Sequence, residues 1–316
     1  MSDARPLISV VTPCYNEEPN LEDCHRAVKE VFERDLPGYR LEHIFCDNAS
    51  DDGSEAVLRR MAAADPNMKV ILNARNYGPF RSTFNGLRHA TGDAVVVLLA
   101  ADLQDPPEVI AQFVEKWRSG HEVAHGVRAK RQELWLMRSV RKAYYRLVSR
   151  LSDIEIPLDV GEFQLVDRKV LQALLQHEDH YPYIRGMIAN CGFRSTGVPY
   201  VWKARRKGFS KNRLYHLVDQ GLNGMISFTN VPMRVAMFVG FGIALLSFVF
   251  AAFTFAVHLF THGRLTTPGI PTLIVALFFF GGLQLMFLGI IGEYVSAIHS
   301  QVRKRPLVVE RETINT

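Results

Sequence analysis

Short apolar runs alternate with amphipathic stretches over the N-terminal third of the chain. The runs have the length of strands, and the stretches between them repeat their apolar residues at helical spacing. The last run is apolar throughout, which is typical of the centre of a parallel sheet. This order predicts an α/β domain with a mostly parallel sheet and flanking helices. Strands are predicted at 7–12, 41–46, 69–72 and 94–101, and helices at 21–34, 55–64 and 80–89.

Two long segments near the C-terminus contain no Asp, Glu, Lys or Arg, at 235–263 and 265–292. Each exceeds the roughly 20 residues that a membrane helix needs. We therefore expect two transmembrane helices, at about 235–260 and 270–292. Basic residues flank the outer ends of both segments, whereas the loop between them carries only Arg264, so both ends are expected in the cytoplasm. A pair of buried helices in a soluble protein is the alternative.

Four regions follow from this pattern. Residues 1–212 are expected to form a cytoplasmic catalytic domain, because the N-terminus shows no signal-peptide pattern. Residues 213–232 read as an amphipathic helix at the membrane surface, with a soluble helix packed on the domain as the alternative. Residues 233–298 form the transmembrane hairpin, and 299–316 a cytoplasmic tail. The chain is thus expected to be a multi-pass membrane protein.

Composition and the absence of common motifs argue against several classes of protein. The formal charge of +5 on 316 residues is too small to argue for nucleic acid. The four cysteines lack CxxC spacing and read as reduced thiols. Neither GxGxxG nor GxxxxGK[ST] occurs, which argues against classical dinucleotide enzymes and P-loop NTPases. The sequence at 121–125 matches the zinc motif HExxH, but glycines bracket it and the context is that of a strand, so we do not expect a metal there.

Polar side chains follow two of the predicted strands. Asp102 and Gln104 come directly after the apolar run, and their oxygens suit Mg²⁺ or Mn²⁺ bridging a diphosphate. Asp105 and Glu108 around a Pro-Pro pair are better explained as caps of a helix start. Asp47 ends another strand, where it is placed to accept hydrogen bonds from a base or ribose. A solvated turn is the alternative for the polar residues that follow Asp47.

Two basic segments offer contacts to phosphate. Arg138 and Lys142 lie on the basic face of an amphipathic stretch, which fits lipid headgroups, with an ordinary solvated face as the alternative. Arg206, Ser210 and Lys211 belong to a basic loop with a glycine hinge that is able to close over phosphates. The alternative for this loop is a topology signal next to the membrane.

These motifs, in this order, resemble family 2 glycosyltransferases. The most similar group is the bacterial polyprenyl-phosphate glycosyltransferases, relatives of dolichol-phosphate mannose synthase. The resemblance implies a GT-A fold and transfer of a sugar from a nucleotide donor to polyprenyl (undecaprenyl) phosphate at the bacterial inner membrane, with Mg²⁺ or Mn²⁺. The segments that carry it are 10–17, 47–54, 102–108, 161–168, 206–211 and 292–294.

The resemblance also implies roles for residues. Departures from the family pattern are Ala100, where the first Asp of Asp-x-Asp is usual, and Glu162 and Gln164, where Asp and Arg are common. A uridine nucleotide is favoured as the donor, guanosine and thymidine stay open, and two-helix anchors often associate into homo-oligomers. The implied sets are Pro13, Tyr15, Glu17 and Asp47 for the nucleotide; Asp102 and Gln104 for the metal; Arg128, Arg206, Ser210 and Lys211 for phosphates; Asp102, Asp159 and Glu162 for catalysis.

Three other functions remain as alternatives. A processive polysaccharide synthase needs more spans and a QxxRW-type motif that this chain lacks. A non-enzymatic scaffolding member of the family is supported only by Ala100. A transferase that acts on a lipid hydroxyl needs a true general base, whereas a phosphate acceptor is already anionic near neutral pH.

Overall fold

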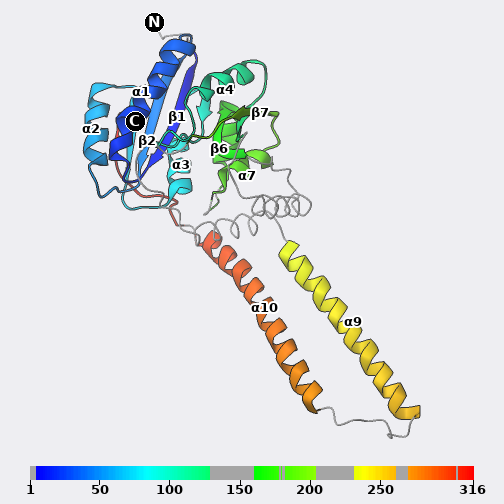
Figure 1. The fold of residues 1–316 in the computed structure, drawn as a ribbon. Coiled ribbons are helices and arrows are strands. Elements are labelled where there is room, and N and C mark those ends of the chain that lie inside the picture. The colour runs from blue at the N-terminus through cyan, green and yellow to red at the C-terminus, as the bar shows by residue number, and fades with distance from the viewer. Residues whose placement is uncertain are drawn as a thin grey trace. The chain divides into compact units, whose positions relative to one another are not determined.

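An eight-stranded mixed sheet organises the described N-terminal part of the chain (Figure 1). The computed structural model describes residues 5–128, 160–177, 179, 182–203, 231–260, 270–303 and 305–316. The strand order is β7-β5-β6-β4-β1-β2-β3-β8. The strands are β1 (Leu7–Cys14), β2 (Arg40–Asp47), β3 (Met68–Asn73), β4 (Ala94–Val96), β5 (Val123–Arg128), β6 (Val160–Asp167), β7 (Ser195–Tyr200) and β8 (Glu310–Ile314).

The centre of the sheet is parallel, as predicted. β1 pairs in parallel with both β2 and β4, and β2 pairs in parallel with β3. β6 runs antiparallel between β4 and β5, and β8 runs antiparallel along β3. The predicted α/β class with a mostly parallel sheet is confirmed. The two antiparallel strands were not predicted.

Helices cover both faces of this sheet (Figure 1). Apolar side chains of α1, α2 and α4, such as Leu21, Leu58 and Phe113, share one buried core with the strands. On the opposite face α3 packs so closely that a Cβ at Gly86 would lie 2.5 Å from Cys46 Sγ. The helices are α1 (Glu18–Asp35), α2 (Ser54–Ala64), α3 (Pro79–Arg88), α4 (Val109–Arg118), α6 (Arg168–Leu175) and α7 (Ile184–Asn190).

The central strand β4 is shorter than its apolar run. The ladder ends at Val96, although the prediction extended the strand to Ala101. Beyond it the backbone bonds alternately to both neighbours, from Val97 N to Gln164 O and from Leu99 N to Val11 O. The chain therefore stays buried between β1 and β6 while it turns toward the loop that carries Asp102.

The C-terminal residues 310–314 return to the sheet of the N-terminal domain as its edge strand β8. The sequence had indicated only a tail at 299–316. Val309 O accepts a hydrogen bond from Ala74 N, and Leu307 is buried. Residues 304–316 thus belong to the same compact unit as the N-terminal domain.

Two long helices form the second unit of the chain. They are α9 (Val231–Phe260) and α10 (Ile270–Val302), and they contact each other. Among the described residues, Phe279–Ser296 in α10 is long and apolar enough to cross a membrane, and Ala236–Ser247 in α9 is a shorter apolar stretch.

Candidate active site

The loops that follow β1 and β2 are joined by hydrogen bonds at the carboxyl edge of the sheet. Cys14 and Asp47, the last residues of the two strands, are register partners. Asn16 N donates to Ser50 Oγ over 2.8 Å, and Asp51 N donates to Asn16 Oδ1 over 2.8 Å. The Tyr15 hydroxyl donates to Asp51 at 3.2 Å. The structure thus brings the segments of Tyr15 and Asp47 together, although they are far apart in sequence.

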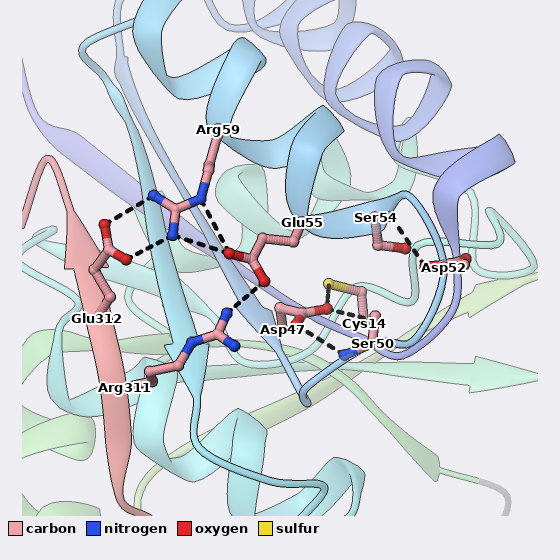
Figure 2. A network of polar contacts seen from close by, with 9 residues as sticks. All are labelled: Cys14, Asp47, Ser50, Asp52, Ser54, Glu55, Arg59, Arg311 and Glu312. Carbon is pink, nitrogen blue, oxygen red and sulfur yellow. Dashed lines mark hydrogen bonds and ion pairs between the residues drawn. The ribbon is translucent and has the colours of Figure 1, made fainter.

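Asp47 is the buried carboxylate of this edge (Figure 2). Ser50 donates to it twice, from Oγ at 2.5 Å and from its backbone N at 3.1 Å. Burial raises the pKa of the Asp47 carboxyl, while the Ser50 hydrogen bonds lower it. Burial and the charge of Asp47 raise the pKa of the neighbouring Cys14 thiol. The Cys14 thiol therefore stays protonated and is not a nucleophile.

Pro13 and Glu17 are half-buried beside these residues. Glu17 N donates to Ser54 Oγ at 3.1 Å, and the Glu17 carboxylate accepts from Asn20 at 2.6 Å. This places the start of α1 against the start of α2. The four residues predicted to contact a nucleotide therefore lie at the ends of β1 and β2 (Pro13 and Asp47) and in the loop after β1 (Tyr15 and Glu17), which contacts the loop after β2.

Three non-glycine residues with positive φ mark the strand-end loops. They are Asn16 (53°), Ala49 (56°) and Leu103 (55°), one in each loop after β1, β2 and the β4 segment. Left-handed backbone at such residues costs free energy and is common where a loop is shaped for a ligand. Each of these residues lies within one of the segments 10–17, 47–54 and 102–108, which carry the resemblance to the family.

The loop after β4 carries the predicted metal ligands. Asp102 and Gln104 are half-buried, and the Asp102 carboxylate accepts from Gln104 N at 3.1 Å. Gln104 O accepts from Lys203 N at 2.9 Å, which ties this loop to the segment after β7. A carboxylate and an amide oxygen at a strand end form a hard donor set, so these residues fit a Mg²⁺ or Mn²⁺ ion.

Asp105 does not cap a helix, and the predicted capping box with Glu108 is wrong. α4 begins only at Val109, and the side chain of Glu108 makes no cap hydrogen bond. Asp105 is instead buried, and its carboxylate accepts from the Tyr200 hydroxyl at 2.5 Å and from Arg128 Nη2 at 3.4 Å. Asp105 therefore bonds to Tyr200, which is 95 residues away in the sequence, rather than to the N-terminus of α4.

Arg128 is the predicted phosphate residue that the structure describes. Its guanidinium is 5.1 Å from the centre of the Trp202 ring, and Nε donates to the Tyr200 hydroxyl at 3.2 Å. Tyr200 and Trp202 were missed by the sequence analysis. Nothing local distinguishes them, because their significance comes from residues on β5 and on the loop after β4.

Glu162 on β6 is half-buried. Arg185 N donates to Oε2 at 3.1 Å, and the Arg185 side chain lies 3.9 Å from Oε1. Burial raises the pKa of Glu162 to about 7, although Arg185 lowers it. Groups titrating near neutral pH are common in active sites. The other predicted site residues, Asp159, Arg206, Ser210, Lys211, Arg138 and Lys142, lie outside the described residues.

The HExxH match does not sit on a helix. His121 precedes β5 and His125 lies within it, as the strand context predicted. Glu122 pairs with Lys169 at 2.7 Å. Within the described residues, this segment therefore forms part of β5 and contributes an ion pair at the surface of the domain.

Comparison with known proteins identifies relatives over almost the whole chain. A family model described as "Glycosyl transferase family 2" matches residues 9–175. The chain is 35% identical to an uncharacterized glycosyltransferase of Bacillus subtilis, YkcC, over 96% of this chain and 93% of that protein. It is 32% identical to the bactoprenol glucosyl transferase of Shigella phage SfII, over 97% and 98% respectively.

Solved structures also align with the chain. One is the mannosyltransferase PcManGT from Pyrobaculum calidifontis in complex with GDP-Man and Mn²⁺, with 21% identity, a TM-score of 0.47 and coverage of 96% of this chain and 88% of that chain. Another is glucosyl-3-phosphoglycerate synthase from Mycobacterium tuberculosis with phosphoglyceric acid, with 21% identity, a TM-score of 0.48 and coverage of 71% and 80%.

Proposed function

This chain belongs to glycosyltransferase family 2, and from that premise we propose that it transfers a sugar from a nucleotide-sugar donor to a polyprenyl phosphate. Relatives named bactoprenol glucosyl transferase, aligned over nearly their full length, support that acceptor. One geometric observation carries the proposal. The Asp102–Asp105 loop, which fits a metal-bound diphosphate, is bonded to the guanidinium of Arg128, which fits a second phosphate.

The proposed reaction is an in-line displacement. An oxygen of the lipid phosphate forms a bond to the anomeric carbon, and the bond from that carbon to the nucleoside diphosphate breaks. The electron pair leaves with the diphosphate, and the configuration inverts. Because the acceptor phosphate is already anionic, little general-base help is required. The main task of the protein is to hold two anionic groups together and to stabilise the leaving diphosphate.

The described residues divide this task. Pro13, Tyr15, Glu17 and Asp47 form the nucleotide side of the site, and the resemblance favours a uridine nucleotide there. Asp102 and Gln104 would hold Mg²⁺ or Mn²⁺, which would supply positive charge to stabilise the diphosphate. Arg128 contacts a phosphate, and Glu162 orients sugar hydroxyls or the nucleophile. Asp159, Arg206, Ser210 and Lys211 stay predictions from the sequence, as do the lipid contacts of Arg138 and Lys142.

We place the sugar-transfer domain at the cytoplasmic face of a membrane. The helices α9 and α10 contain 30 and 33 residues, so each exceeds the length that a bilayer requires. After α10 the chain returns to the catalytic sheet as β8. A chain that leaves this domain and returns to it crosses a membrane an even number of times, which supports a two-helix hairpin.

A transfer assay tests this function. The full-length protein in detergent receives undecaprenyl phosphate, Mg²⁺ or Mn²⁺, and one labelled nucleotide sugar from a panel. We expect label from one donor to enter an acid-labile lipid, and chelation of the metal to abolish transfer. Asp102→Ala should lower the rate by at least about 100-fold, because a charge-stabilising group is lost.

Asp93→Asn is the matched control for Asp102→Ala. Asp93 precedes β4, at the other end of the segment, and among the described residues its carboxylate accepts from Leu7 N at 2.8 Å. Its variant should retain the activity of the wild type. Diacylglycerol replaces the polyprenyl phosphate in a parallel reaction, and transfer to it alone would identify a lipid hydroxyl as the acceptor. Donor binding without transfer to either lipid would favour the scaffolding alternative.

A further inference from the structure

A buried polar cluster joins the loop after β4 to the strands β5 and β7. Asp105 and Tyr200 are 4% and 5% exposed, so both lie in the interior of the domain. The Tyr200 hydroxyl donates to Asp105 Oδ1, and it accepts from Arg128 Nε. Arg128 Nη2 reaches the same Asp105 oxygen at 3.4 Å. Each buried polar group in the cluster therefore has a partner within it.

Two glycines make room for this arrangement. A Cβ at Gly126 would lie 2.6 Å from Cε1 of Tyr200, so only glycine lets the phenol ring cross β5. A Cβ at Gly161 would lie 3.3 Å from Arg128 Nη2. The ring of Phe163 meets Tyr200 edge-on at 5.8 Å. The backbone of β5 and β6 is thus shaped around the phenol and the guanidinium.

Part of the Arg128 guanidinium is held by residues that the structure describes. Trp202 covers one face of the guanidinium, and Nε and Nη2 are bonded to Tyr200 and Asp105. Among the described residues, no acceptor contacts Nη1, and the side chain is 21% exposed. The single contact to Asp105 is longer than the 2.7–2.9 Å bonds of a bidentate arginine–carboxylate pair. The carboxylate therefore orients the guanidinium, and the contacts within the described part of the chain leave Nη1 available to another anion.

The phenol is suited to this role because it stays neutral. Burial, followed by the charge of Asp105, raises the pKa of Tyr200. A protonated phenol is able to donate to the carboxylate and to accept from Arg128 at the same time. The Tyr200 hydroxyl thereby links Asp105 to Arg128 through two hydrogen bonds, so the position of Asp105 affects that of the guanidinium.

We propose that Asp105 and Tyr200 are positioning residues that hold Arg128 ready for a substrate phosphate. Asp105 follows Asp102 by three residues in the same loop, so the orientation of Arg128 is fixed relative to the loop that carries the predicted metal ligands. The inference rests on the proposed function for the identity of the phosphate, which is either the lipid phosphate or the donor diphosphate. Neither residue is placed in contact with substrate.

The test compares Tyr200→Phe with Trp117→Phe. The first removes only the hydroxyl that links Asp105 to Arg128. The second removes an aromatic donor outside the cluster, since Trp117 Nε1 donates at 2.7 Å to Asp167, the last residue of β6. We expect kcat/KM to fall about tenfold or more in Tyr200→Phe and to change less than twofold in Trp117→Phe. The substrate whose KM rises identifies the phosphate that Arg128 contacts.

A double-mutant cycle separates positioning from a merely structural role. In an Arg128→Gln background, Tyr200→Phe and Asp105→Asn should cause no further loss of kcat/KM, because both act through Arg128. Additive losses would overturn the inference. Should Asp105→Asn fail to fold, the cycle is read from Tyr200→Phe alone, which keeps the ring in place.

Calorimetric titration of inorganic pyrophosphate with Mn²⁺ provides a readout that is independent of sugar transfer. We expect Arg128→Gln and Tyr200→Phe to weaken binding similarly, and Trp117→Phe to leave it unchanged. This pattern in a protein that transfers no sugar would uphold the positioning role and overturn the proposed function. Transfer by the wild type, with Tyr200→Phe indistinguishable from Trp117→Phe in both assays, would overturn the positioning role alone. Absence of both transfer and binding in the wild type would overturn both.

Discussion

Glu162 is a carboxyl group whose ionisation is set by its surroundings. Its side chain is 14% exposed, and the pKa of about 7 reflects burial that Arg185 only partly offsets. A carboxyl group in this range changes its charge within the pH interval in which the enzyme is expected to act. Its role in orienting sugar hydroxyls or the nucleophile requires the ionised form, which accepts hydrogen bonds.

The rate of transfer is therefore expected to fall below about pH 7. The acceptor phosphate itself titrates near pH 6, so it contributes a second acidic limb. Glu162→Gln should lower kcat about 10-fold or more and move the acidic limb from about pH 7 toward about pH 6. The measurement is kcat against pH at saturating substrates. An unchanged limb in the variant would show that Glu162 does not control the rate.

A thermal unfolding series checks the same ionisation without substrate. Because the pKa of Glu162 is raised in the folded state, the folded protein binds more protons than the unfolded chain between about pH 4.5 and 7. The contribution of Glu162 to stability is present below about pH 4.5 and is lost as the pH rises through 7. The Tm of the wild type minus that of Glu162→Gln should therefore decrease from pH 5 to pH 8.

Single residues were predictable where a strand ends and were not where a partner lies far away. Asp47 and Asp102 follow apolar runs, and the carboxyl edge of a parallel sheet brings such residues together. The interpretation of Asp105 failed because the local pattern of a cap is also compatible with a buried acceptor. Its donors, Tyr200 and Arg128, belong to strands whose pairing the local sequence does not encode.

At the scale of elements, β8 joins the C-terminal segment to β3 and to the helices α2 and α3. Glu310 accepts from Asn85 and His89, both at 2.7 Å, on α3 and at its end. Figure 2 shows Arg311 bonded to Glu55 and Glu312 bonded to Arg59, both on α2. Since α2 begins at Ser54, beside the loop of Asp47, the tail braces the helix that supports the loop after β2.

Removal of residues 307–316 should therefore destabilise the domain. The truncation exposes the edge of β3 and loses the buried Leu307, which together cost about 2–4 kcal/mol. We expect the Tm to fall by about 10 °C and the KM for the nucleotide sugar to rise. Glu312→Gln keeps the strand and removes one exposed ion pair, so its stability should change by less than about 1 kcal/mol. A truncated protein with the Tm of the wild type would contradict the pairing of β8 with β3.

The elements predicted from the sequence were those whose apolar residues form a run or recur at helical spacing. The limits of β1, β2 and β3 lie within two residues of the prediction, because each strand contains consecutive buried apolar residues: Val10-Val11, Ile44-Phe45-Cys46 and Val70-Ile71-Leu72. β8 escaped prediction because its sequence, ERETI, is mostly charged or polar. Its pairing depends on the open edge of β3 and on ion pairs with α2, neither of which leaves a periodic signal in the strand itself.

At the scale of the whole molecule, the path of the chain constrains its topology. Residues before α9 and residues after α10 belong to the same sheet. The sequence predicted the same arrangement from basic residues at both ends of the apolar segments. These two arguments are independent, since one rests on strand pairing and the other on charge. Both support the proposed two-helix hairpin, for which we expect residues 261–269 on the side of the membrane opposite the glycosyltransferase domain.

Cysteine labelling in bacterial spheroplasts tests this topology. Cys14, Cys24 and Cys46 are buried, and Cys191 is partly exposed in the catalytic domain, so Cys191→Ser provides the background for single substitutions. We expect Thr266→Cys to react with a membrane-impermeant maleimide in intact spheroplasts, and Thr316→Cys to react only after lysis. The wild type serves as the matched control, because Cys191 should also become reactive only on lysis. Labelling of Thr316→Cys in intact spheroplasts would mean an odd number of crossings, which is incompatible with β8 in the catalytic sheet.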